Sequence, residues 1–253
     1  MTTLLAPVPR ASTNVELIEN IGSFSAKGRR GRWPFARGWS REVPSPALGQ
    51  ALHAPARRVC HPRRDSFTGA LLDSFASGVR AAGHEVELAD LYREGFDPSF
   101  RVEDYAQFRS EPMPGEILAE QRRVDRADAL AFVFPVWWWS FPAMLKGWID
   151  RVWSEGWAYN FTPERSKGLL RDRPTVLLGS AATRAATYRK YGYDDAMRVQ
   201  IDTGILGYCG IRGVASHIFH DVDSDSEARR AHLLRSGELG RTFLPHRQTA
   251  SPR

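Results

Sequence analysis

ALAFVFPVWWWSFP, from Ala129 to Pro142, is the segment around which the rest of this chain can be placed. Its first six residues are apolar without polar alternation, which is typical of a parallel strand buried on both faces. Pro135 ends that strand. The Ser140–Pro142 triplet then predicts the start of a helix, because proline suits the first helical turn. A strand, an aromatic loop and a helix are therefore expected in succession.

The helix after the aromatic loop carries an apolar stripe, with residues recurring at steps of three and four. In open α/β sheets, ligands bind outside the carboxyl ends of the strands, so Pro135 to Trp139 is expected where a flat aromatic cofactor would lie. Plain core packing or a partner interface is the alternative for so many aromatic residues. The stripe consists of Phe141, Met144, Leu145, Trp148, Ile149, Val152 and Trp153.

Strand and helix patterns alternate along the rest of the chain, which predicts a doubly wound α/β fold with a parallel sheet of flavodoxin type and strand order 2-1-3-4-5. Asp65 or Ser66 is expected to cap the first helix. His217 and His220 are interpreted as ordinary residues of the last strand. The other strands are expected at 85–91, 129–134, 175–180 and 214–220, and the other helices at 115–128, at 194–208 and after a capping box at 224–227.

The first strand of that sheet is poorly represented in this chain. It should consist of five or six apolar residues just before residue 61, but only Val59 and Cys60 fit. Pro55 removes a ladder donor, and Arg57 and Arg58 would be buried charges. Because burying five aliphatic side chains contributes on the order of 10 kcal/mol, we hypothesise that the natural protein has an apolar strand here or that this chain is a damaged relative.

Residues 134–148, FPVWWWSFPAMLKGW, resemble without a gap the flavin-binding segment of the NAD(P)H:quinone oxidoreductases of DT-diaphorase type. The similarity resumes in Gly156–Phe161 and in Thr203–Gly210. It implies a flavin-dependent NAD(P)H dehydrogenase (quinone)-like enzyme that transfers hydride in a two-electron, ping-pong reaction from NADPH or NADH to a quinone or similar small acceptor. It also implies FAD as the bound cofactor, with FMN as the alternative; Arg63 and Arg64 could meet the second phosphate of FAD.

The resemblance also assigns cofactor-binding residues. It places the flavin phosphates at the first helix start, where the free N–H groups of a helix N-terminus favour an anion. The aromatic loop and the loop after the strand 175–180 would hold the ring. The residues at these positions are His61, Ser66, Phe67, Ala70, Pro135, Val136, Trp137, Trp138, Trp139, Ser180, Ala181, Ala182 and Thr183. Ala182 and Thr183 stand where the resembled family has two glycines.

In the resembled family, a tyrosine and a histidine accommodate the negative charge that appears on the reduced flavin. Tyr188 matches the tyrosine, whereas Asp194 stands where the histidine would be. An ionised aspartate cannot donate a hydrogen bond and would oppose that charge, so this residue departs from the pattern. Tyr159 and Phe161 resemble residues that each subunit contributes to its partner's pocket, which implies a homodimer; local packing is the alternative.

The composition, with 253 residues and 42% hydrophobic content, allows one sizeable domain. Residues 1–58 hold 9 of the 35 Lys and Arg and 3 of the 29 Asp and Glu, so the remainder is neutral. We therefore expect a basic extension at 1–58, disordered or mis-assigned, a flavodoxin-like flavin-binding domain at 59–240 and a tail at 241–253.

The same composition limits partners and compartment. Cys60 and Cys209 are too few for a disulfide framework and are expected to be buried thiols, and no metal site is predicted. No membrane span or signal peptide is expected, which favours a cytoplasmic protein. Nucleic acid is not expected as a partner, although the basic extension is a possible contact for it. A non-catalytic, regulatory flavodoxin-like subunit, such as the ancillary protein of a potassium efflux system, and a degraded inactive relative are the alternative functions.

Overall fold

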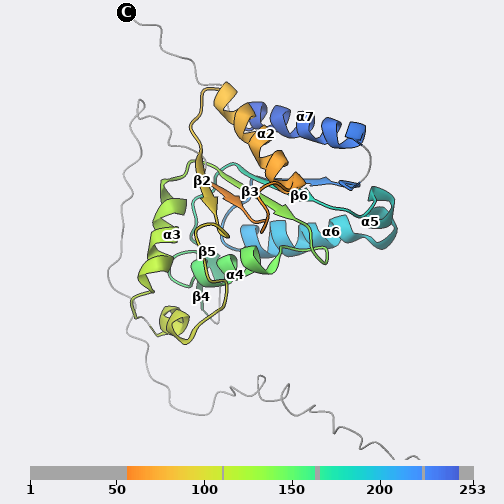
Figure 1. Ribbon diagram of the computed structural model, residues 1–253. Helices are drawn as coiled ribbons and strands as arrows, with labels where there is room; N and C mark the ends of the chain where they lie inside the picture. Colours follow the sequence, from red (N-terminus) through yellow and green to blue (C-terminus); the bar gives the residue numbers. More distant parts are fainter. Residues whose placement is uncertain (1–55, 110, 163–165, 224–225, 245–253) are drawn as a thin grey trace, which may run out of the picture. The chain divides into compact units, whose positions relative to one another are not determined.

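The computed structural model describes residues 56–109, 111–162, 166–223 and 226–244. They contain a five-stranded sheet of order β2-β1-β3-β6-β7 (Figure 1), in which every strand pair is parallel. Numbered among themselves in chain order, these strands have the predicted order 2-1-3-4-5. Their bounds are β1 (Ala56–Val59), β2 (Glu87–Asp90), β3 (Leu130–Pro135), β6 (Thr175–Ser180) and β7 (Val214–Phe219).

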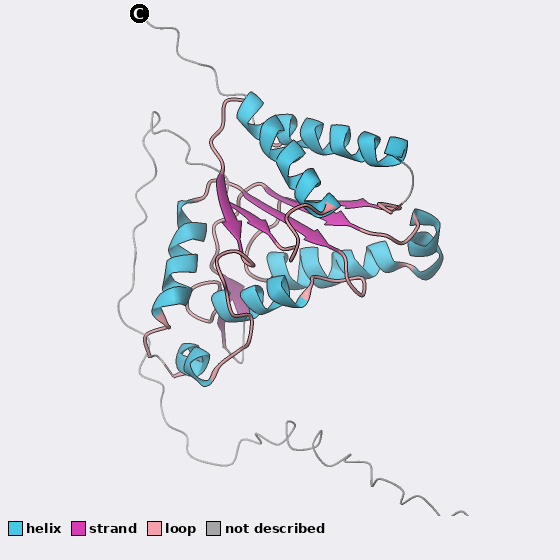
Figure 2. Ribbon diagram, in the orientation of Figure 1, coloured by secondary structure: helices cyan, strands magenta, loops and turns pink. Residues whose placement is uncertain are grey.

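Helices cover both faces of the sheet (Figure 2), with α2 and α7 on one face and α4, α6 and η2 on the other. A short antiparallel hairpin, which the sequence analysis did not predict, follows α4. The helices are α2 (Phe67–Ala81), η1 (Val102–Phe108), α3 (Gly115–Arg126), α4 (Ala143–Val152), α5 (Ala185–Tyr191), α6 (Tyr193–Met197), η2 (Arg198–Gly207) and α7 (Ser226–Thr242), and the hairpin is β4 (Tyr159–Phe161) with β5 (Ser166–Gly168).

The helix expected at 194–208 is instead part of a longer, interrupted helical region. Gly192 has a φ of +70°, a left-handed conformation that suits glycine and separates α5 from α6. The helical path then continues as the π-helix η2. In a π-helix each N–H bonds to the carbonyl five residues earlier, so residues with that spacing lie near one face of the helix. Ile201 and Leu206 have this spacing, and both are buried in the core. Ser224 and Asp225 of the expected capping box lie outside the described residues.

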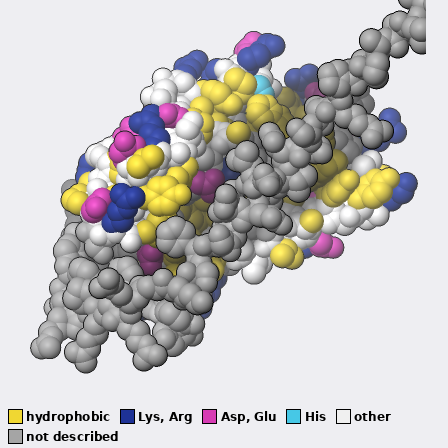
Figure 3. Space-filling model, turned by 90° about the horizontal axis from the view of Figure 1, so that it is seen from below, with side chains coloured by type: hydrophobic (Ala, Val, Ile, Leu, Met, Phe, Trp, Pro, Cys, Tyr) yellow, Lys and Arg dark blue, Asp and Glu magenta, His cyan; other side chains and the backbone are white. Residues whose placement is uncertain are grey.

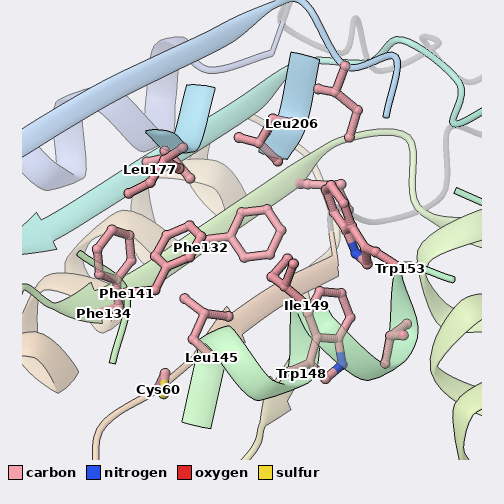
Figure 4. Close-up of a cluster of buried hydrophobic side chains, with 14 of the residues drawn as sticks. Cys60, Phe132, Phe134, Phe141, Leu145, Trp148, Ile149, Trp153, Leu177 and Leu206 are labelled. Carbon is pink, nitrogen blue, oxygen red and sulfur yellow. The ribbon is translucent and has the colours of Figure 1, made fainter. Parts of the chain in front are cut away.

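The core fills both sides of the central strands because alternate strand residues face opposite sides. Ala131 and Val133 belong to the cluster under α2, together with Leu71 and Phe75 of that helix. Phe132 lies on the other side, in a second cluster that includes the inner face of α4 (Figure 4). Figure 4 labels Phe134, Phe141, Leu145, Trp148, Ile149, Trp153, Leu177 and Leu206 in this second cluster.

Strand β1 occupies the centre of the sheet although only four residues form it. Ala56–Val59 pair in parallel with both β2 and β3, and the Cys60 N–H extends the ladder by donating to the Val133 carbonyl at 3.1 Å. The expected extension at 1–58 therefore ends too late, since residues 56–58 belong to the sheet. Likewise, Arg241 and Thr242 of the expected tail belong to α7. Residues 1–55 and 245–253 lie outside the described residues.

None of the helices in the described ranges is both long enough and apolar enough to cross a bilayer.

Candidate functional site

Three loops leave the carboxyl ends of β1, β3 and β6 and contact one another. The Val136 N–H donates to the Ser180 carbonyl at 2.8 Å, and the rings of His61 and Trp137 have centroids 6.5 Å apart. Thr68 Oγ1 and Ser180 Oγ form a buried hydrogen bond of 2.7 Å. The structure thus brings the three segments expected to bind flavin together, at the sheet edge where α/β proteins bind ligands.

The first loop ends in a capped helix. The Ser66 side chain accepts a hydrogen bond of 3.1 Å from the Gly69 N–H, so Ser66 rather than Asp65 is the N-cap of α2. Phe67 opens the helix, and the Ala70 N–H donates to the Ser66 carbonyl. The helix dipole and the first-turn N–H groups make this helix start suited to a phosphate.

Both arginines beside this helix start already pair with carboxylates. The Arg63 guanidinium donates to both oxygens of Asp65, at 3.1 and 2.8 Å. Arg64 pairs with Asp73 of α2. A second phosphate would therefore have to compete with these carboxylates for either guanidinium, which sequence spacing did not reveal.

The aromatic loop is a strained hairpin turn. Trp137 and Ser140 exchange two backbone hydrogen bonds, of 3.3 and 3.1 Å, across Trp138 and Trp139. The two central tryptophans have φ values of +51° and +55°, which are the left-handed conformations of a type I′ turn. Each such conformation costs a non-glycine residue about 1–2 kcal/mol. Strain of this kind is characteristic of ligand-binding and catalytic sites.

The tryptophans of this turn have different surroundings. Trp139 stacks on Tyr193 of α6 with centroids 4.1 Å apart and 27° between the rings. Trp138 is 87% exposed, and Trp137 is also exposed. Trp138 therefore offers most of its indole to a planar ligand, whereas one face of Trp139 is already covered. Exposed indole surface beside a capped helix start fits both the ring and the phosphates of a flavin.

The third loop is tied by backbone hydrogen bonds to the end of β7 and the segment that follows it. The Ala181 N–H donates to the Phe219 carbonyl at 2.8 Å, and the Ala181 carbonyl accepts from the Val222 N–H at 3.2 Å. The Ser180 carbonyl is also bonded, as described above. Ala182 and Thr183 are exposed and carry small side chains. The Thr183 carbonyl also accepts from the Asp221 N–H, at 3.5 Å, which leaves the N–H groups of Ala182 and Thr183 without a hydrogen bond among the described residues.

Tyr188 and Asp194 come together with a third residue, His220, which the sequence analysis treated as an ordinary strand residue. The rings of Tyr188 and His220 have centroids 4.4 Å apart, and His220 Nε2 lies 3.8 Å from Asp194 Oδ1. Burial, and secondarily the charge of Asp194, raises the pKa of Tyr188 to about 12. His220 directly follows the last strand, at the sheet edge where the site lies. This position in the sequence could have marked it as a site residue.

Tyr159 and Phe161 do not join the three loops within one chain. They lie on β4, beyond the end of α4 that is farther from the aromatic turn, and line a cavity of about 540 Å³ with Trp153 and Tyr208. The ten residues of α4 correspond to about 15 Å between the turn and this cavity. Phe161 is 62% exposed. Figure 3 views the molecule from below Figure 1, the side of β4 and η1, and shows patches of exposed hydrophobic side chains.

Both cysteines are buried free thiols, as the sequence analysis predicted. Burial raises the pKa of Cys60 and that of Cys209 to about 12. A thiol with such a pKa is protonated near neutral pH and is a poor nucleophile. Neither cysteine therefore supplies a reactive thiolate to the three-loop site.

Comparisons with known proteins support the same fold. Residues 59–238 match the model of a family described as having the flavodoxin-like fold. The chain is 29% identical over 196 residues to the ribosyldihydronicotinamide dehydrogenase (quinone) of Rattus norvegicus, covering 70% of this chain and 85% of that protein. It is 31% identical over 167 residues to an uncharacterized NAD(P)H oxidoreductase of Haemophilus influenzae, covering 66% of this chain and 83% of that one.

A solved structure extends the comparison to three dimensions. An NAD(P)H:quinone oxidoreductase from Methanothermobacter marburgensis aligns with a TM-score of 0.70 and 34% sequence identity. The alignment covers 77% of this chain and 100% of that chain. Similarity in both sequence and structure therefore extends over most of the described residues.

Proposed function

Since this chain belongs to the flavodoxin-like family that matches its residues 59–238, we propose that it is a flavin-dependent NAD(P)H:quinone oxidoreductase working by a ping-pong mechanism. Its relatives named NAD(P)H dehydrogenase (quinone) and NAD(P)H:quinone oxidoreductase support an oxidoreductase activity of this type. The single observation on which the proposal rests is the three-loop site, in which exposed indole surface on a strained turn lies beside a capped helix start.

In this reaction the protein would hold the flavin, orient its ring and stabilise the negative charge that develops at its polar edge. When bound, a flavin accepts two electrons as hydride from NAD(P)H and passes them to a second substrate. The start of α2 would hold the phosphates, Trp138 would cover the ring, and the N–H groups of Ala182 and Thr183 would favour negative charge at its polar edge. The Tyr188 hydroxyl, with a pKa raised to about 12, stays protonated and able to donate.

The visible spectrum of the purified chain, before and after incubation with FAD or FMN, tests the proposal. We expect a flavin spectrum that bleaches when NADPH or NADH is added anaerobically and recovers when a quinone is added. A bound flavin that neither nucleotide reduces would favour the regulatory subunit instead. Failure to bind either flavin, in a protein shown to be folded by circular dichroism, would contradict the proposal.

The cofactor is proposed to be FAD because the resemblance extends along the whole domain to relatives of the dinucleotide-using branch. In this structure, Arg63 and Arg64 support the choice less than their sequence positions did, since each already pairs with a carboxylate. Chromatography of the extracted cofactor decides between the two flavins, and recovery of FMN alone would contradict FAD.

Replacing Trp138 with glycine is expected to change stability and flavin binding in opposite directions. Glycine adopts a φ near +51° without strain, so the free energy of unfolding of the flavin-free protein should rise by about 1 kcal/mol. The flavin should bind about tenfold more weakly, which corresponds to about 1.4 kcal/mol of lost ring contact. Thermal unfolding and fluorescence titration with flavin measure the two effects.

Trp139→Gly is the matched comparison, because Trp139 has the same backbone conformation but stacks on Tyr193. That variant should lose stability, since it removes a packed ring. A loss of stability in Trp138→Gly, or unchanged flavin affinity, would contradict the role proposed for Trp138.

The active unit is proposed to be a homodimer. Tyr159 and Phe161 lie about 15 Å along α4 from the aromatic turn, so they can contribute to a flavin pocket only from a second copy of the chain. The exposed ring of Phe161 supports such a contact. We expect sedimentation of a dimer and its weakening in Phe161→Ser; a flavin-loaded monomer with full turnover would refute the dimer.

A further inference from the structure

His220 lies at a junction between the third loop of the site and the rest of the protein. It directly follows β7, and the chain then turns at Asp221, which has a φ of +57°. On both sides of it the backbone is tied to the third loop, since the Ala181 N–H donates to Phe219 and the Val222 N–H donates to Ala181. The His220 carbonyl is itself bonded to the ring of His232, at 2.8 Å. These bonds fix the position of the backbone that carries the imidazole.

The imidazole has an unusual set of neighbours. Its side chain is only 18% exposed and packs against Tyr188, and its Nε2 faces Asp194 Oδ1 at 3.8 Å. Its Nδ1 is buried and makes no hydrogen bond of normal geometry among the described residues, although the nearby Thr183 carbonyl acts to raise the pKa of the ring. A buried polar atom without a partner costs free energy and is uncommon in a protein that gains nothing from it.

A polar cavity of about 190 Å³ lies beside the imidazole, on the side of the sheet that α6 and η2 cover (Figure 1). His220 and Asp194 line it together with Arg198, Asp202 and Ser216. Such a cavity is large enough to hold water with polar partners. His220 thus lies between a cavity that can supply protons and the loop whose backbone would hold the polar edge of the flavin.

We infer that His220 takes up a proton beside the third loop when negative charge develops in the site, and that Asp194 is a positioning residue that orients its ring. The pair then replaces the histidine that the resemblance places at position 194. The inference rests on the proposed function: reduction of a quinone by NAD(P)H consumes one proton in addition to the transferred hydride, and that proton must be held near the flavin.

The charges around the imidazole agree with a change of protonation near neutral pH. Burial lowers the pKa of His220, while Asp194, the Thr183 backbone and Asp221 act to raise it and His232 to lower it. The free site therefore holds a neutral imidazole at pH 7. A new negative charge nearby would favour the protonated ring, so its pKa would rise and the ring would gain a proton. Asp194 then stabilises the protonated form rather than opposing the reduced flavin.

Titration of the ring by NMR, in the full chain without added flavin, tests the coupling to Asp194. Removing the Asp194 charge in Asp194→Asn should lower the pKa of His220 by roughly one unit and leave that of His217 unchanged. His217 is the matched control because it lies on β7, the strand that His220 directly follows, and its pKa is lowered by burial and by Arg235 rather than by Asp194. An unchanged His220 pKa would overturn the pairing.

Proton uptake during flavin reduction tests the second half of the inference. With an indicator dye, the wild-type protein should take up more protons per flavin reduced near pH 7 than His220→Gln, and His217→Gln should behave as wild type. Equal uptake in His220→Gln, with flavin bound and fully reduced by NADPH, would overturn the role of His220 and leave the proposed function intact. Failure of the wild type to bind flavin would overturn the proposed function and this role with it, and the NMR titration would still decide the His220–Asp194 pairing.

Discussion

Replacing Arg151 with methionine is expected to lower the free energy of unfolding by about 3–5 kcal/mol, because it leaves a buried carboxylate without its cation. The Arg151 side chain is 1% exposed and that of Asp104 is 0% exposed. Their bidentate contact has nitrogen–oxygen distances of 2.7 and 3.1 Å. The same guanidinium also donates to Glu116 at 2.6 Å and to the Asp97 carbonyl at 2.7 Å.

This network joins α4 to the segment that carries η1. Asp104 lies within η1, and Asp97 precedes it. The exposed aromatic residues Phe100 and Phe108 line the same cavity as Tyr159 and Phe161. Loss of Arg151 should therefore also weaken the proposed dimer. Thermal unfolding should show a melting temperature about 10 °C lower in Arg151→Met.

Lys146→Met is the matched control, since it removes a cation from the same helix. Lys146 pairs with Asp150 at 2.6 Å, but both side chains are exposed, so this variant should change the free energy of unfolding by less than about 0.5 kcal/mol. Changing both buried partners, in Arg151→Met with Asp104→Leu, should recover part of the lost stability, because no charge is then left buried alone. Equal losses for Arg151→Met and Lys146→Met would contradict the buried ion pair.

Replacing Arg57 and Arg58 of β1 with valine and isoleucine is expected to raise the free energy of unfolding by several kcal/mol and to increase the soluble yield. The backbone register places β1 between β2 and β3, in a sheet with helices over both faces. A strand in this position favours aliphatic residues, and each buried aliphatic side chain contributes about 1.5–3 kcal/mol. Urea unfolding and the amount of soluble protein measure the two effects.

Replacing all of residues 50–58 with an aliphatic strand should give a larger gain and a higher flavin content. Arg212→Val, which makes the same kind of change at an exposed position before β7, should leave stability unchanged within about 0.5 kcal/mol. The hypothesis of a defective first strand would be contradicted by a wild-type chain that is already soluble and flavin-replete, with its amino terminus confirmed by mass spectrometry.

The sequence by itself determined the elements whose signals are local. The buried runs of β3 and β6 were predicted because an apolar segment without polar alternation can be satisfied only in the middle of a covered sheet. The strand order followed from alternating strand and helix patterns, and a helix cap at Asp65 or Ser66 from their place before an apolar helix face, although the structure had to decide for Ser66. The similarity of the aromatic loop to a flavin-binding segment pointed to the same sheet edge.

Only the tertiary structure decided the geometry within the site. Left-handed tryptophans at 138 and 139 could not be foreseen, because the local preference of tryptophan opposes that conformation and the surrounding structure enforces it. The separation of Tyr159 and Phe161 from the turn depends on the length and direction of α4. His220 reaches Tyr188 and Asp194 only because β6 and β7 end at the same edge of a parallel sheet, so a contact across more than twenty residues of sequence is set by strand pairing that no local pattern records.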